Sequence, residues 1–210
     1  MAIAAVGALA LAGCGGGGGD KKASKPECKD VAQPAARQSA DHKRPTLRLN
    51  PRKTYTATVV TSCGTFAVEL DVKRAPRTGG SFVTLARHGF YDGLTFHRIA
   101  AGFVVQGGDP NGDGSGGPGY SITEKPPGDL AYSQGTVAMA KTGNEPPGTS
   151  GSQFFVVTAD SDLPPEYALL GTVVKGLDVV QAIEAVGTGA GSDGPPAKPV
   201  VIEKVTITET

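Results

Sequence analysis

Residues 96–110 read FHRIAAGFVVQGGDP, and this stretch decides the fold. Phe96, Arg98 and Ala100 alternate along a first run of strand-forming residues, and Gly102 separates that run from a second one. Alternate residues of a strand lie on one face, and a glycine between two runs accommodates a kink or a bulge. The pattern predicts strand, kink and strand, ending at the Gly-Gly pair, with an arginine close to an apolar floor. A half-buried strand whose arginine merely points to water is the alternative interpretation.

The composition favours one β-rich domain with a tail. The chain has 210 residues, of which 39% are hydrophobic, and it contains 31 glycines and 16 prolines. Many glycines and prolines between short apolar runs indicate turns and strands rather than a helical bundle. The 20 basic residues balance the 20 acidic ones, and no basic run occurs, so no nucleic-acid partner is predicted.

Outward from residues 96–110, about eight strands and two helices are predicted. Further strands are expected at residues 55–61, 66–70, 120–123, 135–140, 153–158, 168–174 and 200–208, and helices at about 75–88 and 177–186. In the first helix, Phe82, Leu85 and Ala86 stand at i, i+3 and i+4, and in the second, Leu177, Val180 and Ile183 share one face. Several strands follow one another with no crossover helix between them, which predicts a mostly antiparallel sheet. Closure of that sheet into a barrel would remove its exposed edges.

Two motifs in the glycine-rich segment do not support a cofactor or a metal. Gly112-x-Gly114-x-x-Gly117 fits a dinucleotide fingerprint, but no helix opens after it. Asp109-x-Asn111-x-Asp113-Gly114 begins like a calcium loop, but its twelfth position is Tyr120 instead of a bidentate glutamate. The three histidines are scattered at sites without zinc-ligand spacing. We therefore predict no cofactor and no metal site.

Three motifs, in order and at matching spacing, resemble the cyclophilin-type peptidyl-prolyl isomerases. They are Phe96-His97-Arg98 with Gly102-Phe103-x-x-Gln106-Gly107-Gly108-Asp109, Met139-Ala140 with Gly151-Ser152-Gln153-Phe154-Phe155, and Leu163-Pro164-Pro165-x-Tyr167. The resemblance covers about residues 55–208. It implies a mainly β fold, a closed eight-stranded antiparallel barrel capped by two α-helices, which agrees with the count of predicted elements.

Residue by residue, the resemblance implies a proline cleft with a catalytic arginine. Arg98 would be that arginine, with Gln106 and Phe103 beside it as catalytic residues. The substrate-binding residues would be Val104, Ala140, the backbone of Lys141, Gln153, Phe155, Leu163 and Tyr167. Val104 stands where the family often has Met, and Tyr167 where many relatives have His, so we expect an altered peptide preference with the reaction retained.

These residue types suit rotation about an X–Pro bond. The reaction has a barrier of about 18–20 kcal/mol and breaks no covalent bond, so it requires no nucleophile. A permanently charged arginine can donate to the prolyl nitrogen as that atom regains its lone pair. The implied function is a peptidyl-prolyl cis-trans isomerase that acts on proline-containing polypeptides as a folding catalyst for exported proteins. A proline-peptide-binding scaffold or holdase with little turnover is the alternative; a solute-binding lipoprotein would need two lobes.

The N-terminal segment resembles a bacterial lipoprotein signal. Residues 1–13 are apolar, too short to cross a bilayer, and followed by Cys14. The resemblance implies cleavage before Cys14, lipidation of its sulfur, and an extracytoplasmic, membrane-anchored monomer; an ordinary secretory signal is the alternative. No Lys or Arg precedes the apolar run, so we expect a start codon farther upstream or a truncated chain. Residues 14–52 are predicted to be a flexible Gly/Pro/Lys-rich tether, and residues 53–210 the isomerase domain.

Export would leave one cysteine pair in an oxidising compartment. Cys28 and Cys63 are the two cysteines that remain once Cys14 is lipidated. Disulfides form and persist outside the cytosol, so we predict a Cys28–Cys63 bond that ties the tail to the first strand. Two free thiols are the alternative.

Overall fold

The structure is a computed structural model that describes residues 1–2, 26–37, 42–189 and 191–210. Cys14 and most of the predicted signal peptide lie outside these residues. Within the described part of the chain, neither helix is long and apolar enough to cross a membrane.

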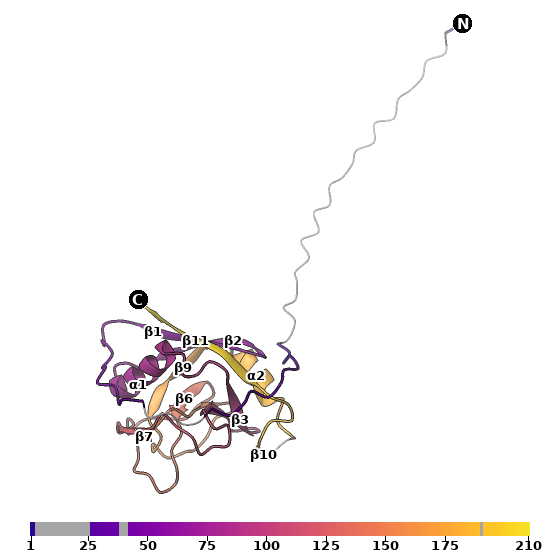
Figure 1. The fold of residues 1–210 in the computed structure, drawn as a ribbon. Coiled ribbons are helices and arrows are strands. Elements are labelled where there is room, and N and C mark those ends of the chain that lie inside the picture. Colours follow the sequence, from indigo (N-terminus) through magenta and orange to yellow (C-terminus); the bar gives the residue numbers. More distant parts are fainter. Residues whose placement is uncertain (3–25, 38–41, 190) are drawn as a thin grey trace.

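Eight strands form a closed antiparallel barrel (Figure 1). They are β1 (Tyr55–Thr61), β2 (Gly64–Leu70), β3 (Leu94–Ala100), β4 (Val104–Asp109), β6 (Thr136–Met139), β8 (Phe154–Val157), β9 (Leu169–Lys175) and β11 (Val201–Glu209). Their order is β3-β11-β1-β2-β9-β6-β8-β4, and pairing of β4 with β3 closes the barrel. The predicted fold, an eight-stranded antiparallel barrel with two helices, is confirmed.

Three more strands have two residues each. They are β5 (Ile122–Thr123), β7 (Thr149–Ser150) and β10 (Asp193–Gly194). β5 pairs with β7, and β10 adds to β3 outside the closed ring. β7 and β10 lie in segments that the sequence assigned to loops, because two residues carry no measurable periodicity.

The two helices lie on opposite sides of the strands (Figure 1). They are α1 (Pro76–Arg87) and α2 (Leu177–Glu184). Proline suits the first turn of α1, where its missing N–H costs nothing. The Glu124 carboxylate accepts the backbone N–H groups of Arg77 and Thr78 at 3.0 and 2.7 Å, so an anion from a distant loop caps the positive end of the helix dipole.

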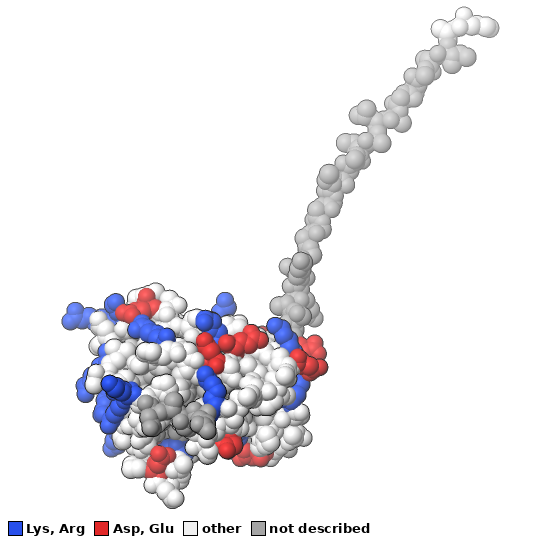
Figure 2. Space-filling model, in the orientation of Figure 1, with Lys and Arg blue, Asp and Glu red and all other residues white. Residues whose placement is uncertain are grey.

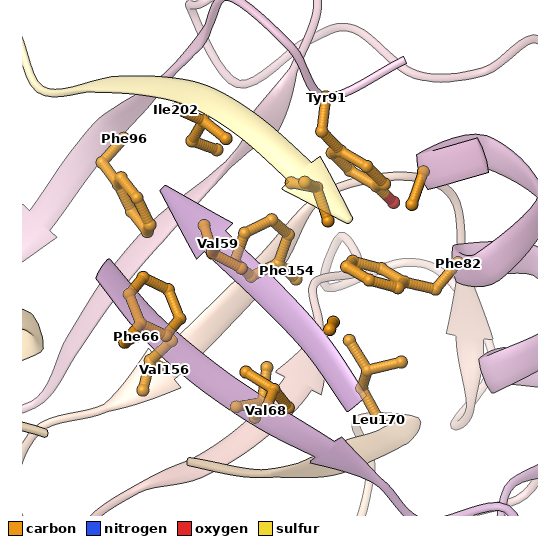
Figure 3. Packing of buried hydrophobic residues seen from close by; sticks show 14 of the residues in the cluster. Val59, Phe66, Val68, Phe82, Tyr91, Phe96, Phe154, Val156, Leu170 and Ile202 are labelled. Atoms are coloured by element: carbon orange, nitrogen blue, oxygen red, sulfur yellow. The ribbon is translucent and has the colours of Figure 1, made fainter. Parts of the chain in front are cut away.

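Apolar side chains fill the barrel interior. Phe66 of β2 and Phe154 of β8 point into the interior, and Phe82 of α1 packs against Phe154 (Figure 3). The ring of Phe154 lies edge-on to the rings of Phe82, Tyr91 and Phe96, each with a centroid separation of 5.9 Å. Such edge-to-face contacts add to the burial of apolar area. The filled interior leaves the outer wall of the barrel as the place for a binding site.

A β-bulge in β3 changes which side chains of the strand point into the barrel and which point outward. The β3–β4 register shifts between Phe96 and Arg98 and leaves His97 without a cross-strand partner. Phe96 is consequently fully buried in the interior, whereas the side chain of Arg98 is 35% exposed. The prediction that Phe96 and Arg98 share one face is wrong, because the extra residue of a bulge reverses the alternation.

β4 continues through the glycine pair instead of ending there. A Cβ on Gly107 would lie 2.9 Å from the carbonyl oxygen of Thr95, and one on Gly108 would lie 2.7 Å from that of Ser152. Gly108 also has a φ of 85°, which favours glycine. The two glycines thus allow neighbouring backbone to approach β4 closely, and the predicted turn is wrong.

Part of the segment predicted to be a tether lies on the barrel. We call residues 26–37 and 42–52 the strap. Cys28 forms a disulfide with Cys63 in the β1–β2 turn, with Sγ atoms 2.00 Å apart. Lys29 N–H donates to the carbonyl of Ser62 at 2.9 Å, and the buried Leu49 is 3% exposed. The strap therefore differs from the predicted flexible tether, because the disulfide, the backbone hydrogen bond of Lys29 and the burial of Leu49 hold it against the barrel.

The strap also contacts the loop that follows β4. Arg37 N–H donates to the carbonyl of Pro110 at 2.8 Å, and His42 N–H to that of Pro118 at 3.0 Å. Backbone bonds of this kind impose no requirement on side-chain type, which explains why composition did not reveal them.

The surface carries ion pairs between side chains of opposite charge. Acidic and basic side chains are interspersed on the face in Figure 2. Glu209, for example, lies 2.7 Å from Nζ of Lys53 and 3.1 Å from Nη2 of Arg87. Exposed pairs of this type contribute about 0–1 kcal/mol each, so the stability of the fold rests on the core.

Because the strap packs against α1, we expect a Gly80→Ala substitution in this helix to destabilise the protein. A Cβ there would lie 2.0 Å from the carbonyl oxygen of Leu47 in the strap. Alanine normally stabilises a helix interior by about 1 kcal/mol relative to glycine, but overpacking costs about 1–3 kcal/mol. We expect Gly80→Ala to lower the free energy of unfolding by about 1–2 kcal/mol in a denaturant titration.

Gly128→Ala is the matched control, because a Cβ at Gly128 meets nothing within 4 Å. A Gly80→Ala protein more stable than the wild type would show that the strap does not pack on α1.

Candidate active site

Arg98 is held on the outer wall by two partners. Its Nε and Nη2 donate to the two carboxylate oxygens of Asp193 at 2.6 and 2.7 Å, and its Nη1 donates to Oε1 of Gln106 at 2.9 Å. Gln106 faces Arg98 across the β3–β4 pairing. The hydrogen bond to Arg98 lowers the pKa of Asp193, and the same bond raises the pKa of Arg98, so both groups stay charged. The site therefore holds a fixed, permanent cation.

A chain of glutamines links this cation to the loop after β4. Nε2 of Gln106 donates to Oε1 of Gln153 at 2.9 Å, and Nε2 of Gln153 donates to the carbonyls of Gly114 and Gly116 at 2.8 and 2.9 Å. Each amide accepts on one side and donates on the other, which fixes the orientation of both side chains. The structure thus brings Gln106 and Gln153 together with Arg98.

An apolar floor lies beside the arginine. Residues of a second hydrophobic cluster, separate from the barrel core, form it: Ala100, Val104, Tyr132, Ala138, Phe155 and Val157 are buried, and the partly buried Phe103, Ala140, Leu163 and Tyr167 pack on them. The apolar and aromatic residues that the sequence predicted for the site all belong to this cluster: Phe103, Val104, Ala140, Phe155, Leu163 and Tyr167. Val104 is only 2% exposed, so it supports the floor from below more than it presents a surface.

Tyr132 fixes the position of Tyr167. Its hydroxyl donates to the carbonyl of Tyr167 at 2.9 Å and accepts the N–H of the same residue at 3.0 Å. The rings of Tyr132, Tyr167 and Phe155 also pack against one another, and Phe155 and Tyr167 meet edge to face at 5.3 Å. Sequence reasoning missed Tyr132, because an isolated tyrosine between two loops carries no pattern.

Lys141 presents its backbone to solvent. Its side chain is 3% exposed, while the residue as a whole is partly exposed, so the accessible surface belongs to the main chain. Nζ lies 3.4 Å from a carboxylate oxygen of Glu166 and 5.5 Å from the centroid of the Tyr167 ring. This arrangement fits the predicted role of the Lys141 backbone as a hydrogen-bonding group for a bound peptide.

The loop after β4 borders a cavity next to the floor. The cavity has a volume of about 280 Å³, and its lining includes Gln106, Gln153, Ala140 and Lys141 together with loop residues 114–121. The buried carboxylate of Asp109 holds this loop by accepting the backbone N–H groups of residues 111, 113 and 114. The acidic residue that resembled the start of a calcium loop is therefore used to shape one wall of the cleft.

Glu184 supports the turn that carries Phe103. Its Oε1 accepts the N–H of Gly102 at 2.7 Å and the hydroxyl of Thr158 at 2.5 Å. A carboxylate at the C-terminal end of α2 is unfavourable toward the helix dipole, and these two donors offset that cost. Neither Glu184 nor Asp193 was predicted, since both act through contacts between segments far apart in the sequence.

A closed antiparallel barrel with an arginine fixed beside an aromatic floor on its outer wall is the architecture of the cyclophilin type. The family model described as cyclophilin type peptidyl-prolyl cis-trans isomerase/CLD matches residues 56–207. The chain belongs to this family.

Relatives of known description support the same family. The chain is 40% identical over 166 residues to the probable peptidyl-prolyl cis-trans isomerase B of Mycobacterium tuberculosis, covering 71% of this chain and 53% of that protein. It is 44% identical over 136 residues to the peptidyl-prolyl cis-trans isomerase of Helicobacter pylori, covering 63% and 82%. The chain thus spans about half the length of the mycobacterial B relatives.

A solved structure agrees. The crystal structure of a Cryptosporidium parvum cyclophilin type peptidyl-prolyl cis-trans isomerase superposes with a TM-score of 0.67 at 29% identity, covering 74% of this chain and 98% of that one. The same protein in the presence of the dipeptide Ala-Pro gives a TM-score of 0.66.

The burial of the Tyr132 hydroxyl predicts that the stability of the protein depends on pH at high pH. Burial raises the pKa of Tyr132 to about 12, so the folded protein keeps a proton that the unfolded chain loses above pH ~10. The free energy of unfolding is therefore unaffected by the titration of this group below pH ~10. It falls as the pH rises from ~10 toward 12, by at most about 1.4 kcal/mol per pH unit for this group.

In denaturant titrations between pH 9 and 12, the free energy of unfolding should therefore fall more steeply with pH for the wild type than for Tyr132→Phe. Parallel profiles would show that Tyr132 is not buried as described.

Proposed function

We propose that the chain catalyses cis-trans isomerisation of X–Pro peptide bonds in proline-containing polypeptides. The observation that carries this proposal is the placement of the Arg98 guanidinium beside the apolar floor. Of its five N–H donors, three are used by Asp193 and Gln106, which leaves two for a peptide. A donor that is fixed in place next to a surface for an apolar ring is what rotation about a prolyl bond requires.

The reaction depends on binding the twisted amide more strongly than the planar forms. Twisting removes the amide resonance, and the prolyl nitrogen regains a lone pair that accepts a hydrogen bond from Arg98. Phe103, Phe155 and Leu163 hold the proline ring while the preceding carbonyl rotates. Only interactions that are stronger in the twisted state accelerate the reaction.

No single contact supplies the whole effect. A rate gain of about five orders of magnitude corresponds to roughly 7 kcal/mol. One charge-assisted hydrogen bond contributes about 1.5–3 kcal/mol. Anchoring of the peptide by the Lys141 backbone, Gln106 and Gln153, and exclusion of water by the aromatic floor with Tyr167 and Ala140, supply the rest in this proposal.

The alternative is a proline-peptide scaffold or holdase with little turnover. It uses the same floor but has no need of a donor aimed at the reacting nitrogen. The pairing of Arg98 with both Asp193 and Gln106 favours the enzyme, because holding a flexible cation in one place is useful only if its direction matters.

We also infer that the protein acts on exported proteins as a lipid-anchored monomer outside the bacterial cytoplasm. The apolar run that ends at Cys14 supports this inference, and so does the Cys28–Cys63 disulfide, since such bonds persist in oxidising compartments. The strap, beginning at residue 26, would then leave a short segment between the membrane surface and the barrel.

Arg98→Ala should leave the fold intact and lower kcat/KM by about 100-fold, on the scale of losing one transition-state donor. A protease-coupled assay with a proline-containing peptide measures it. Arg74→Ala is the matched control, because Arg74 also forms an exposed pair with an aspartate, at 2.6 Å, but on another part of the barrel. Near wild-type turnover in Arg98→Ala would contradict the role of Arg98.

The anchor predicts a lipidated N-terminus at Cys14. Intact-mass measurement of the protein from its own cells should give a chain that begins at Cys14 and carries acyl groups, and it should partition into detergent. Replacement of the gene by a Cys14→Ser version should move the protein to the aqueous phase. An unlipidated mature terminus in the wild type would contradict the anchor.

A further inference from the structure

The segment between α2 and β11 places an acidic residue beside the active-site arginine. β10 pairs with β3 so that Asp193 lies opposite Ala100 and Gly194 opposite Ile99. The N–H of Ala101 donates to the carbonyl of Ser192 at 2.9 Å and extends this pairing. Asp193 is thereby fixed at the edge of the strand that carries Arg98.

The contact between the two side chains is fork to fork. Both oxygens of the Asp193 carboxylate accept, one from Nε and one from Nη2 of Arg98, at 2.6 and 2.7 Å. Two parallel bonds define the plane of the guanidinium, whereas a single bond would leave it free to rotate. Gln106 holds the remaining nitrogen, Nη1, at 2.9 Å.

We propose that Asp193 is a positioning residue that orients Arg98 for the isomerisation reaction. The proposal rests on the role of Arg98 given under the proposed function. With Asp193 and Gln106 in place, one N–H on Nη1 and one on Nη2 remain for the substrate. Asp193 itself does not touch the reacting atoms.

Asp193 has two opposing effects on the site. Its negative charge weakens the attraction of the cleft for a developing lone pair, while its geometry keeps the donor aimed. The side chains of Arg98 and Asp193 are 35% and 55% exposed, so water and salt screen the charge effect. The geometric effect does not depend on screening, and it therefore dominates.

The expected signature is a loss in kcat with KM almost unchanged. Asp193 improves an interaction made in the twisted state, and loss of such an interaction lowers kcat and kcat/KM together. We expect Asp193→Ala to lower kcat about tenfold, with KM within about twofold of wild type. Asp193→Asn, which can accept only one of the two bonds, should lie between Asp193→Ala and the wild type.

The Glu variant and a matched control separate positioning from a general effect on the loop. Asp193→Glu retains a carboxylate and should recover part of the lost kcat. Asp71→Ala removes the partner of Arg74, another exposed pair at 2.6 Å, and should leave kcat unchanged. The Nε–H resonance of Arg98 in nitrogen-15 spectra should exchange slowly with solvent in the wild type and in Asp71→Ala, and rapidly in Asp193→Ala.

Combination with Arg98→Ala distinguishes this inference from the proposed function. In the Arg98→Ala background, Asp193→Ala should cause no further loss. If Asp193→Ala retains the wild-type kcat while Arg98→Ala loses most of its kcat, the positioning role of Asp193 is overturned and the proposed function stands. Wild-type turnover in Arg98→Ala would overturn the proposed function itself.

Discussion

The bulge at His97 is the constraint on which the site depends. It inserts one unpaired residue into β3, and the reversed alternation places Phe96 inside the barrel and Arg98 outside it. Without that extra residue, a strand that buried Phe96 would also direct Arg98 into an apolar interior, where an unpaired cation is very costly. The same strand therefore contributes Phe96 to the core and Arg98 to the candidate site, so the barrel interior is filled with apolar side chains while the guanidinium lies on the outer wall.

Two layers of support surround the arginine. Hydrogen bonds run from Asp193 through Arg98, Gln106 and Gln153 to the carbonyls of the loop after β4, so the direction of the donor and the shape of the cleft are linked. Beneath them, the rings of Tyr132, Phe155 and Tyr167 hold the floor. This rigidity suits a reaction whose catalysis consists of binding a twisted amide, since small misplacements of a donor reduce such binding strongly.

The sequence predicts the fold well, and it fails where distant segments meet. Alternation and turn residues predicted a mostly antiparallel sheet, and apolar spacing predicted both helices. The resemblance of three motifs to a known family implied the closed barrel and the residues of the cleft. The bulge at His97 has no sequence signal, because alternation alone cannot show an inserted residue. Asp193 is held by the pairing of β10 with β3, and the strap is held by backbone hydrogen bonds to loops far along the chain. Periodicity within a short window of sequence does not report contacts between such distant segments.

In the proposed function, the cleft promotes rotation about the prolyl bond and does not only bind the peptide. The most direct test is exchange spectroscopy on a proline-containing peptide that is labelled at the residue before proline. With a small fraction of the protein present, exchange peaks should connect the cis and trans forms of the peptide on a timescale much shorter than the uncatalysed tens of seconds. Shifts of the peptide signals on binding, with no exchange between the two forms, would contradict the proposed function.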